Sequence, residues 1–157
     1  MNTSISHIDL THAARIKAFY ELLKPRLSFL VVFSSGFGYS LANQSFMNWG
    51  SFVCFLIAGF LVSGSSVTIN QVIEQKLDAM MKRTQNRPIP SHRITSGEAV
   101  WFSIFTGIAG LGIMLIATNL LTTLLSAISL ILYAFVYTPL KRVGSIAVFV
   151  GAIPGAL

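Results

Sequence analysis

Long runs of apolar residues alternate with short polar segments along this chain. Four runs approach or exceed the length of about 20 residues that a membrane-spanning helix needs; they cover residues 27–42, 51–73, 99–117 and 120–137. A fifth run, 145–157, would be about 20 Å long as a helix, against a hydrocarbon core of about 30 Å. The pattern predicts an all-α, polytopic integral membrane helix bundle with four complete transmembrane helices and a truncated fifth.

Composition supports this interpretation. Of the 157 residues, 54% are hydrophobic and 10% are charged, whereas soluble domains average about 25% charged residues. A disordered chain would combine low hydrophobicity with high charge. Both classes are therefore excluded, and the expected surroundings are a lipid bilayer.

The basic residues indicate how the chain lies in the membrane. All 11 Lys and Arg, which give a net charge of +6, fall before the first run, between the second and third runs, or directly after the fourth. The connections 43–50 and 118–119 carry none. Basic loops stay on the cytoplasmic side, so we expect a cytoplasmic N-terminus, in a bacterial inner membrane. The charge thus marks topology and does not indicate a nucleic-acid partner.

The first 26 residues form a separate cytoplasmic segment. Within it, residues 13–23 are predicted to form an amphipathic helix at the membrane surface, which Pro25 would end. The transmembrane domain is expected to occupy residues 27–157. The single cysteine, Cys54, lies in an apolar run and allows no internal disulfide.

Candidate chemistry appears where the second run ends. Asn70, Glu74 and Asp78 are spaced four residues apart, so on a helix they share one face. Carboxylates at this depth are costly unless they are paired or bind a metal. Oxygen ligands suit Mg²⁺ or Mn²⁺, and Mg²⁺ in proteins often completes its shell with substrate phosphates.

Basic residues follow this stripe closely. Lys82, Arg83 and Arg87 lie within ten residues of Asp78, and arginine can bind phosphate through two hydrogen bonds at once. Lys141 and Arg142 are expected on the same membrane face, as further phosphate contacts or as topology-setting charges. The spacing therefore predicts a magnesium–diphosphate site at the cytoplasmic mouth of the bundle, suited to a lipid diphosphate.

Spacing alone leaves a simpler alternative. Glu74 and Asp78 could be solvated residues at a helix end, paired with Lys76 and Lys82. His92, in the same loop, is expected to be a solvated histidine, with contact to a heme as the less favoured reading.

Three segments resemble the UbiA superfamily of intramembrane prenyltransferases. Residues 70–90, NQVIEQKLDAMMKRTQNRPIP, are similar to the first Asp-rich motif, N-x-x-x-D-x-x-x-D, and its trailing RTxNRPxP. Residues 23–39 and 137–157, LKPRLSFLVVFSSGFGY and YTPLKRVGSIAVFVGAIPGAL, most resemble the protoheme IX farnesyltransferase (heme O synthase) branch. The three matches follow one another in the order of the family, and residues 27–157 correspond to the N-terminal half of its transmembrane domain.

The resemblance implies a reaction and assigns roles. A farnesyl group would pass from farnesyl diphosphate to a vinyl group of heme b, with addition of water, to give heme O for terminal oxidases. Asn70, Glu74 and Asp78 match the positions that hold Mg²⁺ and diphosphate, while Arg83 and Arg87 match diphosphate contacts. Heme b is then a substrate, and heme A synthase or a terminal oxidase would be expected partners.

Two departures from the family pattern matter. The first acidic position is Glu74 instead of Asp, and no acidic residue follows Glu98, so the second Asp-rich motif of the family is absent. This keeps two alternatives open: another UbiA-type enzyme that prenylates an aromatic quinone precursor, and a non-catalytic membrane fragment. A downstream extension of the coding sequence that contains DxxxD would identify the chain as partial.

Overall fold

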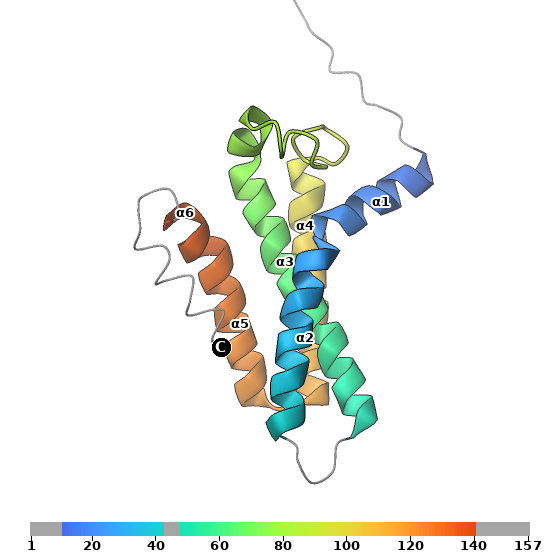
Figure 1. Cartoon of the computed structure of the whole chain (residues 1–157), viewed down its shortest axis with the longest axis vertical. Coiled ribbons are helices and arrows are strands. Elements are labelled where there is room, and N and C mark those ends of the chain that lie inside the picture. The colour runs from blue at the N-terminus through green and yellow to red at the C-terminus, as the bar shows by residue number, and fades with distance from the viewer. Residues whose placement is uncertain (1–10, 43–47, 141–157) are drawn as a thin grey trace, which may run out of the picture.

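The structure, a computed structural model, describes residues 11–42 and 48–140, and within these ranges every regular element is helical. In chain order the elements are α1 (His12–Leu22), α2 (Pro25–Ala42), α3 (Trp49–Met80), α4 (Ser96–Ala117), α5 (Leu120–Ile131), the π-helical segment η1 (Leu132–Tyr137) and the short α6 (Thr138–Leu140). Figure 1 shows α2, α3, α4 and α5 running roughly lengthwise, with α1 set at an angle to them. The predicted all-α fold is confirmed.

Three of the described helical stretches are long and apolar enough to cross a membrane: Trp49–Met80, Ser96–Ala117 and Leu120–Tyr137. The first predicted span is present as α2, which has 18 residues but includes Arg26 and four serines, so it is less apolar. A fourth complete span therefore stays a prediction. The truncated fifth, residues 145–157, lies outside the described residues.

The second predicted span is longer than its apolar run. Helix α3 continues from residue 73 to Met80, and its buried residues there include Glu74 and Asp78. The helix thus carries polar side chains into packed surroundings instead of ending where the apolar residues end. This extension places the candidate site on a continuous, regular helix.

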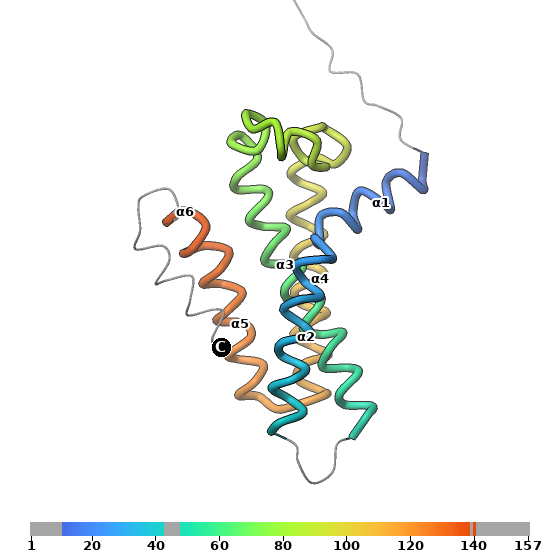
Figure 2. The backbone as a smooth tube through the Cα atoms, viewed as in Figure 1, coloured from blue at the N-terminus to red at the C-terminus, as the bar shows by residue number. Residues whose placement is uncertain are grey.

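Helix α3 is the centre of the bundle and contacts α1, α2, α4, α5 and η1. Its closest partner is α4, with which it runs side by side in both views (Figures 1 and 2). Ser65 Oγ donates to the Ser103 carbonyl oxygen at 2.8 Å, and Ser103 Oγ donates to the Ser65 carbonyl oxygen at 3.1 Å. Small residues allow this close approach, as is usual between membrane helices.

Helix α1 covers the loop that joins α3 to α4. The helix predicted at 13–23 is thus present, while its position at a membrane surface stays a prediction. Its buried residues Ala18 and Leu22 form a small apolar core with Ile89, Ile94 and Ala99. The rings of Phe19 and Phe102 extend this core, with centroids 5.0 Å apart.

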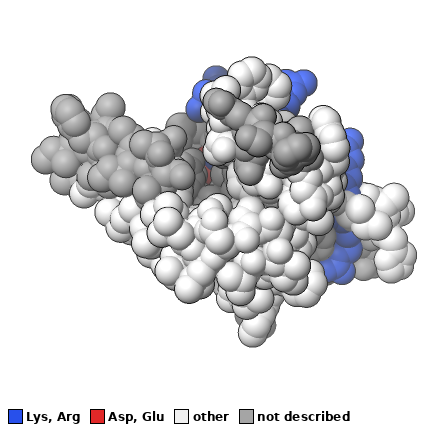
Figure 3. Space-filling model, turned by 90° about the horizontal axis from the view of Figure 1, so that it is seen from below, with Lys and Arg blue, Asp and Glu red and all other residues white. Residues whose placement is uncertain are grey.

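The ends of the bundle differ in charge. Every Lys and Arg within the described ranges belongs to α1, to the connection 23–24, to the start of α2, to the last turns of α3, or to the loop 81–95. Seen from the opposite end, the molecule presents mostly uncharged side chains, with Lys and Arg toward its edges (Figure 3). This separation agrees with the grouping of charges in the sequence.

Candidate functional site

The predicted stripe on α3 is buried. The relative exposures of Asn70, Glu74 and Asp78 are 6%, 8% and 2%. These values contradict the alternative in which the two carboxylates are solvated at a helix end. Asn70 Oδ1 has no hydrogen-bond partner, which is unusual because buried polar atoms normally find one.

Asp78 anchors the loop that follows it. Its carboxylate forms an ion pair with Arg87 Nη1 at 2.5 Å, and its carbonyl oxygen accepts a hydrogen bond from Thr84 Oγ1 at 2.9 Å. Backbone turns continue the loop, since Arg87 N donates to the Thr84 carbonyl and Ser91 N donates to the Arg87 carbonyl, both at 3.0 Å. The cation that Asp78 meets is therefore Arg87 and not Lys82.

A small polar cavity of about 250 Å³ lies between α1, α3 and this loop. Its lining consists of Glu21, Lys24, Gln71, Arg83, Asn86, Arg87 and Pro88. Three of these seven side chains are cationic, so the cavity suits an anion the size of a diphosphate. Lys24 stands at its edge with a φ of 43°, a backbone conformation that non-glycine residues seldom adopt.

The structure brings together some of the predicted basic residues and not others. Arg83 and Arg87 line the cavity, whereas Lys82 is exposed and is not among the lining residues. Lys141 and Arg142 lie outside the described residues. His92 is exposed, with a φ of 58°, which agrees with its reading as a loop residue.

Sequence reasoning did not single out Lys24, Tyr133 and Tyr137. The two tyrosine rings stack with centroids 5.3 Å apart on η1, which packs against α3. Tyr133 lies within electrostatic range of Glu74. Two tyrosines four residues apart near the end of an apolar run were the available signal, and π-helical segments often occur at functional sites.

An apolar groove of about 780 Å³ runs along α2 and α3. Its lining on α3 includes Phe52, Leu56 and Phe60, each 18 residues before a member of the stripe. Eighteen residues make five helical turns, so groove and stripe lie on the same face of α3. The groove volume falls within the usual range of about 300–1,000 Å³ for ligand pockets.

The stripe supplies oxygen donors only: one amide and two carboxylates. Mg²⁺ is commonly held by one or two carboxylates plus waters and substrate phosphates, and the unpartnered Asn70 Oδ1 is a further oxygen donor. These residues therefore fit a divalent cation that shares a phosphate ligand. Among the described residues no three His, Cys, Asp or Glu side chains cluster to hold a metal by themselves.

The fold and the site define a helical membrane protein in which a buried acidic stripe faces a basic loop. The chain belongs to the UbiA prenyltransferase family, whose family model matches residues 31–157. It is 46% identical to the protoheme IX farnesyltransferase of Cytophaga hutchinsonii, over 92% of this chain and 50% of that protein. For the enzyme of the same name from Flavobacterium psychrophilum the identity is 44%, over 88% and 47%.

A eukaryotic relative has the same name. The mitochondrial protoheme IX farnesyltransferase of Arabidopsis thaliana is 40% identical, over 93% of this chain and 34% of that protein. The chain thus spans about half the length of the bacterial relatives described above. No solved structure matches it.

Proposed function

We propose that the protein carrying this sequence transfers a farnesyl group from farnesyl diphosphate to a vinyl group of heme b, producing heme O. The observation that supports this most is the buried Asn70–Glu74–Asp78 stripe, whose Asp78 pairs with Arg87, a lining residue of the cationic cavity. The names of the relatives give the substrates. Loss of diphosphate needs cations near the leaving group, and the cavity provides them.

In the proposed reaction the bond between farnesyl C1 and the diphosphate oxygen breaks, and its electron pair leaves with the diphosphate. Arg83, Arg87 and Lys24 would stabilise the negative charge that develops there. A divalent cation held by the stripe, magnesium or manganese, would neutralise further charge when bound. The vinyl π electrons then attack the allylic cation, and water adds to the new cation and loses a proton.

The apolar groove is the proposed place for the farnesyl chain. The groove residues of α3 and the stripe lie on one face of that helix. The farnesyl chain of a diphosphate bound at the stripe could therefore extend along this face into the groove. Aromatic side chains such as Phe29 and Phe60, whose ring centroids are 5.1 Å apart, lie in its wall. Apolar walls exclude water, which protects an allylic cation from premature capture.

The test is product formation in membranes that contain the product of the complete reading frame. These membranes are incubated with heme b, farnesyl diphosphate and Mg²⁺, and porphyrins are analysed by liquid chromatography and mass spectrometry. We expect heme O. Prenylated 4-hydroxybenzoate without heme O would instead identify a quinone-precursor enzyme, and the absence of any prenyl transfer would support the non-catalytic alternative.

The first prediction concerns Asp78, the most buried member of the stripe. Replacement of Asp78 by Ala removes a proposed metal ligand and leaves Arg87 without its ion-pair partner, so we expect turnover to fall at least about a thousandfold. Lys76→Ala is the matched control, because Lys76 is exposed on the same helix. Near-normal turnover of the Asp78→Ala variant would refute the assignment of the stripe.

A further inference from the structure

Arg93 connects three parts of the molecule. Its Nη2 forms an ion pair with Glu21 Oε2 of α1 at 2.8 Å and also donates to the Asn86 carbonyl oxygen at 2.8 Å. Its Nε donates to Ser91 Oγ at 3.1 Å. One guanidinium thus joins the N-terminal helix to two points of the loop that follows α3.

The loop residue that Arg93 holds is next to a proposed ligand. Asn86 precedes Arg87, which pairs with Asp78, and both Asn86 and Arg87 line the polar cavity. Glu21, the partner of Arg93 on α1, lines the same cavity. A continuous series of contacts therefore leads from α1 through Arg93 to the cations of the site.

Apolar packing against α1 also holds the loop 81–95 in place. Ile89 and Ile94, 4% and 2% exposed, are buried against Ala18 and Leu22 of α1. Arg93 N and Ile94 N both donate to the Pro88 carbonyl oxygen, at 3.0 and 3.1 Å. Packing determines where the loop lies, whereas Arg93 is the side chain that reaches back to the backbone beside Arg87.

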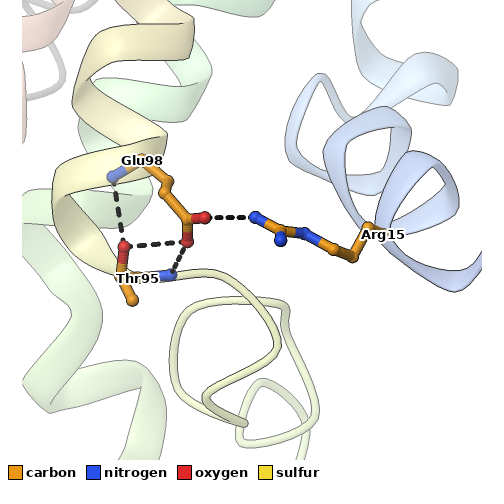
Figure 4. A network of polar contacts seen from close by, with 3 residues as sticks. All are labelled: Arg15, Thr95 and Glu98. Carbon is orange, nitrogen blue, oxygen red and sulfur yellow. Dashed lines mark hydrogen bonds and ion pairs between the residues drawn. The ribbon is translucent and has the colours of Figure 1, made fainter. Parts of the chain in front are cut away.

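A second ion pair between α1 and the bundle provides a comparison. Arg15 pairs with Glu98, whose carboxylate also accepts hydrogen bonds from the Thr95 backbone and hydroxyl in a capping box at the start of α4 (Figure 4). Both ion pairs join α1 to the bundle: Arg15 meets Glu98 in the first turn of α4, and Glu21 meets Arg93 in the loop 81–95. Arg15, however, contacts Glu98 at the start of α4, while Arg93 contacts Asn86 in the wall of the cavity.

We propose that Arg93, held by Glu21, is a positioning residue that orients the loop cations Arg83 and Arg87 toward the diphosphate. This makes α1 a part of the diphosphate site and not only a membrane-surface anchor. The proposal rests on the proposed function, since it requires a prenyl diphosphate substrate. It predicts a selective defect in diphosphate binding, because neither Arg93 nor Asn86 lines the apolar groove.

The experiment compares Arg93→Gln with Arg15→Gln in the product of the complete reading frame. Each variant removes one cation from an ion pair that ties α1 to the bundle. We expect Arg93→Gln to raise the KM for farnesyl diphosphate about tenfold, as loss of charge-assisted hydrogen bonds would. The KM for heme b should stay within about twofold, and Arg15→Gln should leave both values within about twofold.

A second measurement does not depend on turnover. Hydrogen exchange of the backbone amides in residues 81–95, followed by mass spectrometry in nanodiscs, should be faster in Arg93→Gln than in Arg15→Gln or wild type. Equal effects of the two variants, equal changes in both KM values, or unchanged loop exchange would each overturn the proposal. If wild type itself makes no heme O, the proposed function fails, and the exchange experiment still shows whether Arg93 holds the loop.

Discussion

The side-chain oxygen of Asn70, Oδ1, is buried and has no hydrogen-bond partner. Its neighbours on the stripe have partners, since Asp78 meets Arg87 and Glu74 also takes part in a polar interaction. A buried acceptor without a partner costs about 1–3 kcal/mol. Such a cost is understandable if a ligand supplies the missing contact, which is the role that the resemblance gives to Asn70.

This leads to a prediction about stability and binding. Asn70→Ala should change the melting temperature of the ligand-free protein by only a few degrees, because the lost side chain makes no bond through Oδ1. It should abolish most of the stabilisation that Mg²⁺ and an unreactive thio analogue of farnesyl diphosphate give to wild type, since only binding to the native state stabilises it. Both effects are read from thermal unfolding in detergent.

The control is Ser66→Ala. Ser66 lies one helical turn before Asn70, is buried, and donates within α3, to the Ser63 carbonyl oxygen at 2.9 Å. Its removal should preserve the stabilisation by ligand. A full ligand-induced shift in Asn70→Ala would contradict the proposed role of the amide.

For single residues, the sequence predicted which side chains share one face of a helix. It did not predict which side chains from different helices or loops contact one another. Asn70, Glu74 and Asp78 could be predicted because a period near four residues defines a helix face. Lys24 and Tyr133 come from outside α3, and only packing brings Lys24 to the cavity and Tyr133 close to Glu74. The pairing of Asp78 with Arg87 instead of Lys82 was also not predictable, because it depends on the turns of the loop.

Helix packing explains some of the glycines of α4 but not all of them. A Cβ placed on Gly110 would lie 2.9 Å from Val62 Cγ2 and 3.0 Å from the Val62 backbone nitrogen of α3. A Cβ on Gly112 would meet nothing within 4 Å. Two glycines of the same helix, two residues apart, thus have different roles.

The element-scale prediction follows from this difference. Gly110→Ala should separate α3 from α4 and lower stability by about 1–3 kcal/mol, the usual cost of overpacking. Gly112→Ala should be neutral or slightly stabilising, since glycine in a helix interior is about 0.5–1 kcal/mol less favourable than alanine. Thermal unfolding of both variants in detergent tests this, and equal destabilisation of the two would show that the α3–α4 contact is wrong.

The sequence predicted the elements well where an apolar run and a helix coincide. The predicted connection at residues 118–119 lies between the end of α4 and the start of α5. Asn119 caps α5, since its Oδ1 accepts a hydrogen bond from Thr122 N at 2.8 Å. The apolar run ends at residue 73, whereas α3 continues to Met80, as the helical spacing of Asn70, Glu74 and Asp78 predicted. A helix whose polar side chains face protein can continue beyond its apolar run, as α3 does.

On the scale of the whole molecule, charge is confined to one end. Within the described ranges, the candidate site, α1 and all Lys and Arg lie at the end that carries the loop 81–95, and the connection at Thr118–Asn119 carries no charge. Moving charged side chains across a bilayer costs several kcal/mol each. The positive-inside rule then predicts an orientation in which the proposed diphosphate site opens to the cytoplasm.

The last prediction tests that orientation. In a Cys54→Ser background, single cysteines replace Gln85 in the loop and Leu120 at the start of α5; both positions are exposed. A membrane-impermeable maleimide added to spheroplasts should label Leu120→Cys at once and Gln85→Cys only after permeabilisation, because the basic loop is expected to be inside. The opposite pattern would place the diphosphate site on the outer face. That pattern would also contradict the idea that one set of cations has two roles. In that idea the Lys and Arg proposed to bind the diphosphate also keep their loop on the cytoplasmic side.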